Sequence, residues 1–588
     1  MQQDILLSNA IQLYASGQFD EAEKMFRQIL DLNPVHGQAL YFLGIIALSK
    51  GVMDEACRLL YNACLSDPKN KDYSYSLAVA LQESGKFDEA LHRYEEIADM
   101  PEAQNNMGNI RRQKGELEKA RTAFDKAIEI NPKFVWAYVN KALLERQENH
   151  QKKAEDLLET ALQIEPDFIQ GLYQLSVQNR LNKNFNKSSQ LIEKALKLND
   201  KVDFIWVEYG KVLTALEQPQ KAIDAFEKAI QLNRFCADAY FEKAALLEEK
   251  SPDTAEEAYR NVLRIDSNNI AAYNNLGALL YRKNRTVEAL EMYRSVFIIK
   301  PDDVSAAFNL AVALVDLDNF EEAAGLYFKI LGQKQLETEV HLRLANMLPK
   351  WHKTDAQKAL EYATGWVKNF PDNPLAVHTN DALNGKASSE DIDFAYTQTF
   401  YDGFADSYES KMNLLKCQIP NLIADKLKGQ SFQNVLDLGC GTGSCGLFLK
   451  KQTTRLIGVD ISKNMIQKAE EKHIYDALFT NDISDFLQNT KEQFDLIIAA
   501  DVFCYINNLK DILKEIHNVL NSSGTFIFTI EKSEKDETNI QISGRYQHNQ
   551  KQIETELKSA GFKDINCEEV VLRQENGNDC IGYLFEAK

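Results

Sequence analysis

A repeat of about 34 residues runs through the first 374 residues and constrains the fold of this 588-residue chain more than any other feature. A small residue that begins an apolar run returns at steps of 30 to 36 residues. These small residues are Ala22, Ala56, Ala90, Ala120, Ala154, Ser188, Ala222, Ala255, Ala289, Ala323 and Ala359. In most units a Leu-Gly pair or its substitute lies upstream, and a bulky ring such as Phe26 or Phe124 often follows. A unit this short cannot bury its apolar face alone, so neighbouring units must stack into an array.

Prolines close many of the units, at Pro34, Pro68, Pro132, Pro166, Pro301 and Pro371. With the small and large positions, they make a pattern that resembles the tetratricopeptide repeat, in about eleven copies over residues 3–373. The resemblance implies an all-α superhelix of paired antiparallel helices, in which rings fill the space between units. It also implies a concave groove that binds a protein or peptide. A spacer or an oligomerisation arm is the alternative.

Side-chain amides recur on the first helix of several units. The sixth repeat position is Asn106, Asn140, Asn275 and Asn309 in four units, and Gln174 in a fifth. An amide can donate to a peptide carbonyl and accept from a peptide N–H, so a row of amides could hold an extended chain whatever its sequence. The row resembles the asparagine ladder of the O-GlcNAc transferase superhelix. Asparagine is also simply common at this position, which is the alternative explanation.

Composition changes near residue 380, because eleven of the twelve prolines lie at or before Pro374. The segment 383–393 is small and polar, as segments that join domains often are. We therefore predict a repeat solenoid over residues 1–382, a linker over 383–393 and a second domain over 394–588. One or two helices are expected over 394–427, before the periodicity changes.

The second domain alternates apolar strand-like runs with helical stretches. Strands are predicted at 434–438, 455–460, 477–480, 494–500, 524–530, 565–572 and 580–586. Such alternation predicts an α/β fold with a mostly parallel sheet that helices cover on both faces. The ligand of such a sheet binds outside the carboxyl ends of its strands, beside the first strand.

The glycine loop after the first strand matches two kinds of cofactor site. Gly441-x-Gly443-x-x-Gly446, with Asp460 nineteen residues after Gly441, satisfies the dinucleotide fingerprint of an NAD site. Three features favour S-adenosylmethionine instead: Asp437 just before the glycines, the polar Asn481-Asp482 after the third strand, and a final pair of strands that suggests an antiparallel hairpin.

Together these features resemble the Rossmann-like class I methyltransferase fold. Within it, the chain is similar to predicted methyltransferases that carry N-terminal tetratricopeptide repeats. Three segments carry that closer resemblance: Phe400-Tyr401-Asp402-Gly403-Phe404-Ala405-Asp406-Ser407-Tyr408-Glu409, Ala500-Asp501-Val502-Phe503-Cys504-Tyr505, and Ser543-Gly544-Arg545-Tyr546-Gln547-His548.

The resemblance implies a role in cofactor binding for eleven residues. They are Tyr408, Asp437, Gly439, Gly441, Gly443, Asp460, Ile461, Met465, Asp482, Ile483 and Asp501. The glycines leave room for the cofactor, whose carboxylate would meet backbone N–H groups at the helix start. Asp460 would accept from both ribose hydroxyls, with a helix N-cap as its alternative role. Asp482 and the Ile483 amide would bind the adenine, and Ile461 and Met465 would pack on it.

Asp437 would hold the glycine turn or the cofactor's ammonium group, and Tyr408 would close over the site, although aromatics on amphipathic helices usually belong to the core. A solvated loop acid is the alternative for Asp482. The catalytic residues stay unknown, because methyl transfer needs a base only when the acceptor arrives protonated. Candidate bases near the expected mouth are Asp501, Tyr505, Glu531 and His548, and Arg545 could hold an anionic acceptor. A surface helix start is the alternative for Arg545 and His548.

Charge and cysteine content exclude several other classes. The net charge of −20 opposes general binding to nucleic acid or anionic lipid. Nine scattered cysteines show no zinc spacing, so no metal is predicted and a reduced, cytoplasmic protein is expected. No stretch is apolar and long enough to predict a membrane span.

The sequence thus predicts an S-adenosylmethionine-dependent methyltransferase whose solenoid recruits a protein or peptide partner that is also the methyl acceptor. One alternative keeps the enzyme but gives it a small molecule or glycan as acceptor, with the repeats used for assembly or oligomerisation. The other alternative is a non-catalytic repeat scaffold.

Overall fold

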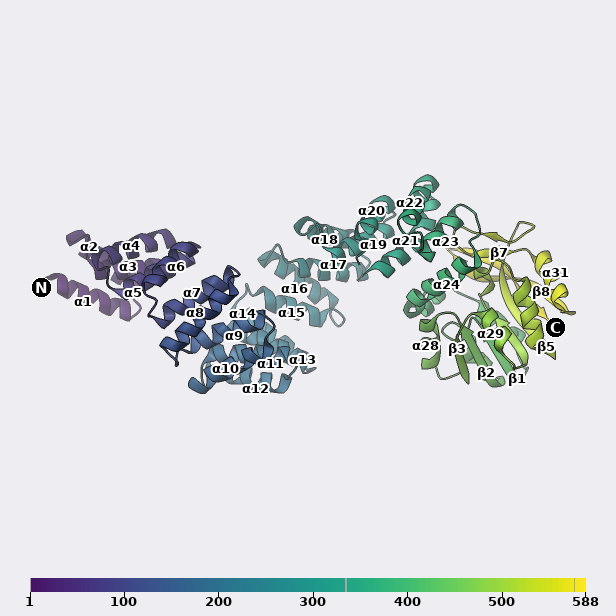
Figure 1. The fold of residues 1–588 in the computed structure, drawn as a ribbon, viewed down its shortest axis with the longest axis horizontal. Coiled ribbons are helices and arrows are strands. Elements are labelled where there is room, and N and C mark those ends of the chain that lie inside the picture. The colour runs from purple at the N-terminus through teal and green to yellow at the C-terminus, as the bar shows by residue number, and fades with distance from the viewer. Residues whose placement is uncertain (1, 334–335, 576) are drawn as a thin grey trace. The chain divides into compact units, whose positions relative to one another are not determined.

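The computed structural model describes residues 2–333, 336–575 and 577–588 (Figure 1). The chain forms two compact units, Met1–Ala272 and Tyr273–Lys588. The predicted division at residues 382 and 393 stays a prediction, although the helices α23 and α24 end and begin at Leu383 and Glu390.

The first unit consists of antiparallel helix pairs, one pair for each repeat. Its helices are α1 (Gln2–Ala15), α2 (Phe19–Leu32), α3 (Gly37–Ser49), α4 (Met53–Ser66), α5 (Lys71–Glu83), α6 (Phe87–Glu96), α7 (Pro101–Gln113), α8 (Leu117–Ile130), α9 (Val135–Gln147), α10 (Gln151–Ile164), α11 (Ile169–Leu181), α12 (Phe185–Leu198), α13 (Asp203–Ala215), α14 (Pro219–Leu232), α15 (Ala237–Leu247) and α16 (Pro252–Ile265). The helical repeat predicted from the 34-residue period is therefore confirmed.

The repeats continue into the second unit. Their helices are α17 (Ile270–Arg282), which spans the boundary, α18 (Thr286–Ile299), α19 (Val304–Asp316), α20 (Phe320–Ile330), α21 (Glu337–His352), α22 (Ala356–Asn369) and α23 (Pro374–Leu383).

Small residues and rings of the same helix pair pack against each other. A Cβ atom added to Gly108 on α7 would lie 2.4 Å from the ring of Phe124 on α8, and one on Gly210 would lie 2.4 Å from the ring of Phe226. Both rings are fully buried. These rings therefore fill the space left by the glycines within a pair. Phe26 of α2 also stacks on Phe42 of α3 in the next repeat, with ring centroids 5.2 Å apart, so a ring also packs between units as the sequence predicted.

A sheet follows after the helices α24 (Glu390–Phe404), η1 (Ala405–Ser407), α25 (Tyr408–Leu414) and α26 (Ile419–Lys426). Its strands are β1 (Phe432–Leu438), β2 (Thr453–Asp460), β3 (Ala477–Thr480), β4 (Phe494–Ala499), β5 (Leu520–Lys532), β6 (Asn539–Ile540), β7 (Tyr546–His548), β8 (Ile565–Glu575) and β9 (Asn578–Ala587). Strands β1 to β5 pair in parallel in the order β3-β2-β1-β4-β5. The predicted final hairpin is present, because β8 and β9 are antiparallel and β9 pairs with β5.

Helices cover both faces of this sheet, as predicted. They are α27 (Gly446–Leu449), α28 (Lys463–Glu471), α29 (Ile483–Asn489), η2 (Phe503–Tyr505), α30 (Lys510–Val519) and α31 (Gln550–Ala560). Successive strand residues point to opposite faces. Thus Leu436 packs with Leu513 of α30 in one core cluster, and Val435 packs with Ile423 of α26 in another.

Two local features differ from the sequence predictions. The helix expected to run from the glycine loop to about Lys451 is the single turn α27, because the loop continues to Cys445. The short strands β6 and β7 were not predicted, and they extend the far end of β5. His548 lies in β7 and is fully buried, so the alternative that placed it at a surface helix start is wrong.

Among the described residues, no helix is long and apolar enough to cross a membrane.

Candidate active site

A cavity of about 360 Å³ lies beside the carboxyl ends of the parallel strands, where the sheet topology predicts a ligand. Its lining comes from α24, α25 and α30 and from the segments that follow β1, β2, β3 and β4. From the predicted cofactor residues, Tyr408, Gly439, Gly441, Asp460, Ile461, Met465, Asp482, Ile483 and Asp501 line this cavity. Asp437 and Gly443 do not.

The glycines of the loop leave room for neighbouring side chains of the protein as well as for the cavity. Gly439 has a φ of +65°, and a Cβ atom on it would lie 2.3 Å from Val502. A Cβ atom on Gly443 would lie 3.0 Å from the ring of Tyr475, on the side away from the cavity lining. At Gly441 the nearest contact would be Tyr408, at 4.0 Å. Of the three glycines, Gly441 therefore best matches the predicted role of leaving room for a ligand.

Asp460, at the end of β2, ties the glycine loop to the start of α28. Its carboxylate accepts from the backbone N–H of Gly441 at 2.8 Å and from that of Ser462 at 2.9 Å. Burial raises the pKa of Asp460 to about 6, although these N–H bonds favour the charged form. The N-cap of α28 is Ser462, so the alternative role of Asp460 as that cap is wrong.

Asp437 lies beneath the loop rather than in the cavity. It is 1% exposed and accepts a hydrogen bond from the Tyr475 hydroxyl at 2.7 Å. Burial raises the pKa of Asp437 to about 7, and the neighbouring charge of Asp460 adds to the rise. Of the two predicted roles, holding the glycine turn fits this position better than binding an ammonium group. The sequence analysis did not identify Tyr475, which carries no motif of its own.

The third-strand residues reach the cavity with their own local roles. Asp482 is the N-cap of α29 and accepts from the backbone N–H of Asp485 at 3.1 Å. Ile483, at the start of that helix, lines the cavity with Ile461 and Met465. The apolar side chains and the acid thus lie together, as an adenine ring with its amino group would require.

The helix α24 forms part of the cavity and is tied to both of its neighbours. Asp402 accepts from the Ser462 hydroxyl at 2.6 Å, which links α24 to the start of α28. Tyr401 bonds to the hydroxyl of Tyr505, and both tyrosines line the cavity. Burial raises the pKa of Tyr505 well above its ordinary value, so its phenol is neutral and unsuited to act as a base near pH 7.

The last repeat helix, α23, is bonded to a residue that lines the cavity. His378 of α23 is 2% exposed, and its ring nitrogens lie 2.9 Å from the Asp393 carboxylate and 2.9 Å from the Gly544 carbonyl. Asp393 also accepts from the Tyr546 hydroxyl at 2.8 Å, and it lines the cavity. These contacts of His378 were not predicted from the sequence, because His378 lies among repeat residues and 166 positions before Gly544.

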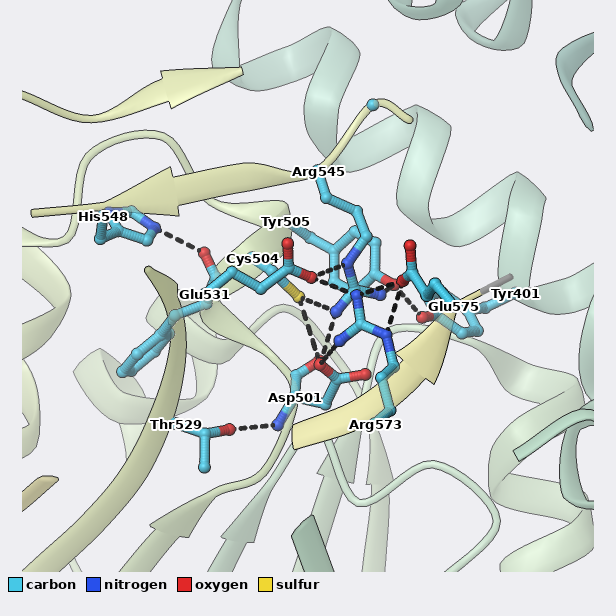
Figure 2. A network of polar contacts seen from close by, with 12 residues as sticks. Tyr401, Asp501, Cys504, Tyr505, Thr529, Glu531, Arg545, His548, Arg573 and Glu575 are labelled. Carbon is cyan, nitrogen blue, oxygen red and sulfur yellow. Dashed lines mark hydrogen bonds and ion pairs between the residues drawn. The ribbon is translucent and has the colours of Figure 1, made fainter. Parts of the chain in front are cut away.

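Asp501 belongs to a buried network of two arginines and two carboxylates (Figure 2). Arg545 of the β6–β7 region bonds to Asp501 and Glu531, and Arg573 of β8 bonds to the same two carboxylates. Glu575 also accepts from Arg573, at 2.8 Å from its Nε atom. Although burial opposes ionisation, the two arginines hold the pKa of Glu531 below its ordinary value.

This network changes the interpretation of several predicted residues. Arg545 is already paired, so it does not present a free cation to an anionic acceptor. Glu531 is ionised, paired and outside the cavity lining. Asp501, Cys504 and Glu531 offer ligand atoms with metal-like spacing, but Arg545 donates to all three. Arg573, which is 2% exposed, was not identified from the sequence.

Asp501 lines the cavity, whereas His548 lies outside its lining. Asp501 lines the cavity with a φ of +60°, and its N–H donates to the Thr529 hydroxyl at 3.0 Å. His548 does not line the cavity: its Nε2 lies 2.9 Å from the Phe503 carbonyl and its Nδ1 lies 3.1 Å from the Thr538 hydroxyl. A carbonyl only accepts, so Nε2 carries a proton. Burial lowers the pKa of His548, which makes this ring neutral.

The four predicted partner residues are all partly buried on first helices of repeats. The amide of Asn106 donates to the hydroxyls of Tyr75 at 3.2 Å and Tyr94 at 3.0 Å, and the amide of Asn140 donates to Asn105 at 2.9 Å. Asn275 and Asn309 lie on α17 and α19 of the second unit. At least Asn106 and Asn140 therefore bond within the solenoid, and a peptide-binding ladder stays a prediction.

Family models match both parts of the chain. A model described as a methyltransferase domain matches residues 436–528. Two repeat models match as well: one described as a tetratricopeptide repeat matches residues 7–72, 210–270 and 275–335, and one described as a TPR repeat matches residues 108–145. The chain therefore combines tetratricopeptide repeats with a methyltransferase domain near its C-terminus, as the resemblance implied.

Curated relatives match short stretches of the chain. An uncharacterized protein of Haemophilus influenzae is 31% identical over 149 residues, which are 22% of this chain and 56% of the relative. The human mitochondrial arginine-hydroxylase NDUFAF5 is 31% identical over 20% of this chain and 35% of the relative. A malonyl-(acyl-carrier protein) O-methyltransferase of Hamiltonella defensa is 33% identical over 16% of this chain and 36% of the relative. The chain thus spans about half or less of the length of these relatives.

Among solved structures, the repeats are similar to YrrB, described as a TPR protein with an unusual peptide-binding site. The identity is 28%, the TM-score is 0.26, and the match covers 31% of this chain and 95% of that chain.

Proposed function

We propose that the C-terminal domain is an S-adenosylmethionine-dependent methyltransferase and that the solenoid recruits a protein or peptide that is its methyl acceptor. The observation that carries the proposal is the meeting of predicted residues in one place. Nine of the eleven cofactor residues named from the sequence line a single cavity of about 360 Å³. These nine come from α25, the glycine loop and the ends of three further strands, so local sequence alone does not bring them together.

The residues of the cavity fit this cofactor. The carboxylate of Asp460 would accept from the ribose hydroxyls, and Asp482 would accept from the adenine amino group. Ile461, Met465 and Ile483 would contact the adenine ring, and Gly441 would leave space beside it. The group brings a methyl carbon that is already electrophilic, so the protein mainly needs to position the acceptor and exclude water.

The chain's own groups at the inner end of the cavity favour positioning over proton removal. Arg545 and Arg573 hold the Asp501 carboxylate from behind. Tyr505 accepts from both Arg545 and Tyr401, so the remaining O–H of this neutral phenol is free to donate to an acceptor atom. We therefore assign Asp501 and Tyr505 to holding the acceptor, and we assign His548 no catalytic role.

The similarity to relatives does not by itself select the reaction, because one relative named as an arginine-hydroxylase is 31% identical and one named as an O-methyltransferase is 33% identical over the matched stretches. Recruitment by the repeats is proposed because stacked repeats present an extended surface of the kind that binds proteins. The cytoplasmic location and the oligomeric state stay predictions.

The test is a calorimetric titration of S-adenosylmethionine and S-adenosylhomocysteine into the full chain and into an Asp460→Asn variant. We expect the wild type to bind both ligands and the variant to bind at least tenfold more weakly. Asp476→Asn is the matched control, because Asp476 lies near the same strands but pairs with Lys450 outside the cavity. Thermal unfolding of both variants separates loss of the site from loss of the fold.

Binding to the wild type and the control alone would justify incubating lysate with labelled cofactor to find the methylated acceptor. If the folded wild type binds neither ligand, the methyltransferase proposal is wrong, and the nicotinamide cofactor suggested by the same glycine spacing would be titrated next.

A further inference from the structure

Three consecutive repeats of the first unit carry an arginine at the same position of their first helix. Arg112 lies on α7, Arg146 on α9 and Arg180 on α11, each 34 residues after the one before. The residue 28 positions after each arginine lies on the next first helix, and these residues are Asn140, Gln174 and Glu208. Arg146 and Arg180 bond to these residues directly, across the interface between two repeats.

At the third step a carboxylate balances the charge of the arginine. The Nε and NH2 atoms of Arg180 donate to the two carboxylate oxygens of Glu208 at 2.7 and 3.1 Å. Glu208 is 3% exposed, so this two-pronged pair is shielded from water. The geometry is the one in which a guanidinium binds a carboxylate most strongly. It also shows that the surface at this repeat position accommodates a carboxylate.

At the first two steps an amide stands where the carboxylate would be. Arg146 donates to the Gln174 side-chain oxygen at 2.8 Å, and its NH1 atom is buried without a hydrogen-bond partner among the described residues. The Nε atom of Arg112 is buried in the same state. In the part of the chain that the structure describes, neither arginine forms an ion pair, whereas the adjacent Arg111 pairs with Glu95 at 3.5 Å.

Among the described residues, no carboxylate therefore bonds to the arginine at either of these two steps. Burial lowers the pKa of Arg146, the charge of the more distant Glu208 raises it, and the charges of Arg112 and Arg180 lower it further. Their influence shows that the three guanidinium groups are electrostatic neighbours. A row of partly buried, like-charged groups with unused N–H donors is costly by itself and is relieved by an anion. It lies in a chain whose net charge is −20.

We propose that Arg112 and Arg146 bind carboxylate side chains of an acidic peptide segment along the first helices α7, α9 and α11. A bound carboxylate would supply the negative charge that Glu208 supplies at the third step, and it would accept from the N–H groups that the amides leave unused. The planar guanidinium fork favours carboxylate over a neutral amide by charge and by geometry. This inference rests on the recruiting role proposed for the solenoid, and it gives the partner a chemical class.

The experiment uses a fluorescein-labelled peptide of alternating glutamate and glycine, and a matched peptide with glutamine in place of glutamate. Fluorescence anisotropy follows binding of each to the full chain. We expect binding of the glutamate peptide only, with an affinity that falls as salt is added. Arg146→Met should weaken this binding about tenfold or more, which corresponds to the loss of a charged hydrogen bond.

Gln174→Glu is the sharper variant, because it leaves every arginine in place. It should recreate the Arg180–Glu208 pair at the second step and weaken peptide binding as much as Arg146→Met does. Glu208→Gln should do the reverse, freeing Arg180 and strengthening binding. Arg111→Met removes the same charge from α7, the helix of Arg112, at a residue that is paired with Glu95, and it should change the affinity by less than about twofold.

The proposal is overturned if the glutamate peptide does not bind, if it binds no better than the glutamine peptide, or if Gln174→Glu leaves its affinity unchanged. Displacement by inorganic phosphate but not by free glutamate would also overturn it, in favour of a phosphate ligand. Tryptophan fluorescence checks that the variants are folded, because Trp136 and Trp206 lie in this unit. Titrating S-adenosylmethionine into the same samples separates a failure of this proposal from a failure of the methyltransferase proposal.

Discussion

The molecule contains two clusters of partly or fully buried arginines, and they differ in what surrounds the guanidinium groups. In the methyltransferase domain, Arg545 and Arg573 share the carboxylates of Asp501 and Glu531. In the solenoid, Arg146 donates to an amide, and neither Arg112 nor Arg146 has a carboxylate partner among the described residues. The pKa shifts follow this difference. Although burial opposes the charge in both, acidic neighbours raise the pKa of Arg545, whereas the pKa of Arg146 is lowered.

The comparison separates arginines that maintain structure from arginines that are available to a ligand. A buried guanidinium with two carboxylates fixes the geometry of its neighbours, and removing it leaves their charges unpaired. A guanidinium without a carboxylate contributes little to folding and retains its capacity to bind an anion. The same residue type therefore predicts opposite outcomes of substitution in the two regions.

The largest effect of an arginine substitution is expected for Arg573→Met. The change leaves two buried carboxylates with one arginine, and it should lower the free energy of unfolding of the methyltransferase domain by about 3 kcal/mol or more. All four tryptophans lie in the repeats, so hydrogen exchange of β5 and β9, followed by mass spectrometry, is the suitable measurement. Arg455→Met, which removes a half-exposed partner of Glu492, should cost at most about 1 kcal/mol. Equal effects of the two variants would contradict the assigned role of the network.

A pH dependence is expected from Asp437, a buried carboxyl with no cation at its side chain. Its pKa is raised to about 7 in the folded protein, from 3.8. The folded state therefore binds this proton more tightly, and stability falls as the pH rises from about 4 to about 7. The change approaches about 4 kcal/mol if burial acts in full.

Asp437→Asn should remove this contribution and keep an oxygen that can accept from Tyr475, while the smaller slope from Asp460, whose pKa is raised to about 6, remains. Hydrogen exchange of β1 at pH 5 and pH 8 measures the difference between wild type and variant. A wild type that is equally stable at both values would show that the Asp437 carboxyl is not buried as described.

Glu208→Gln should have a smaller effect, and it acts on the paired step of the solenoid. The substitution leaves the Arg180 guanidinium without its carboxylate, at a cost of about 1 to 3 kcal/mol. Trp206 lies two residues away on α13, so urea unfolding followed by its fluorescence reports the change. No loss of stability would mean that the Arg180–Glu208 pair contributes nothing to folding, and the contrast with the unpaired steps would disappear.

The smallest effect on stability is expected for Arg146→Met. No ion pair is lost, and a long apolar side chain can fill the same partly buried space, so only the hydrogen bond to the Gln174 oxygen is removed. The free energy of unfolding should fall by about 1 kcal/mol or less, as measured by the same urea titration. A loss of stability as large as that of Arg573→Met would show that the arginines of both clusters contribute equally to folding.

Local sequence patterns predicted most of the fold. The 34-residue period identified the helix pairs, and each of the seven expected strands overlaps an observed one. The pattern also located the cavity, because the glycine loop and the acids at the strand ends lie where topology brings strand ends together. These features are predictable because they depend on neighbours within one strand, one turn or one repeat.

Other features of the site depended on residues that are far apart in the sequence. Arg573 approaches Asp501 across 72 positions, and His378 reaches Gly544 across 166. Neither residue belongs to a recognisable motif. The same holds for His548, whose helix-like surroundings in the sequence gave no sign that β7 would bury it.

By itself, the sequence determined that the chain has repeats followed by a methyltransferase domain, and which loop and strand ends surround its cavity. Only the tertiary structure decided which charged groups are paired and which are not. The physical reason is that the environment of a charge depends on all of its neighbours in space. Arg180 and Arg146 occupy equivalent positions in the repeat, and only the residue on the next helix gives one of them a carboxylate partner and the other a neutral amide.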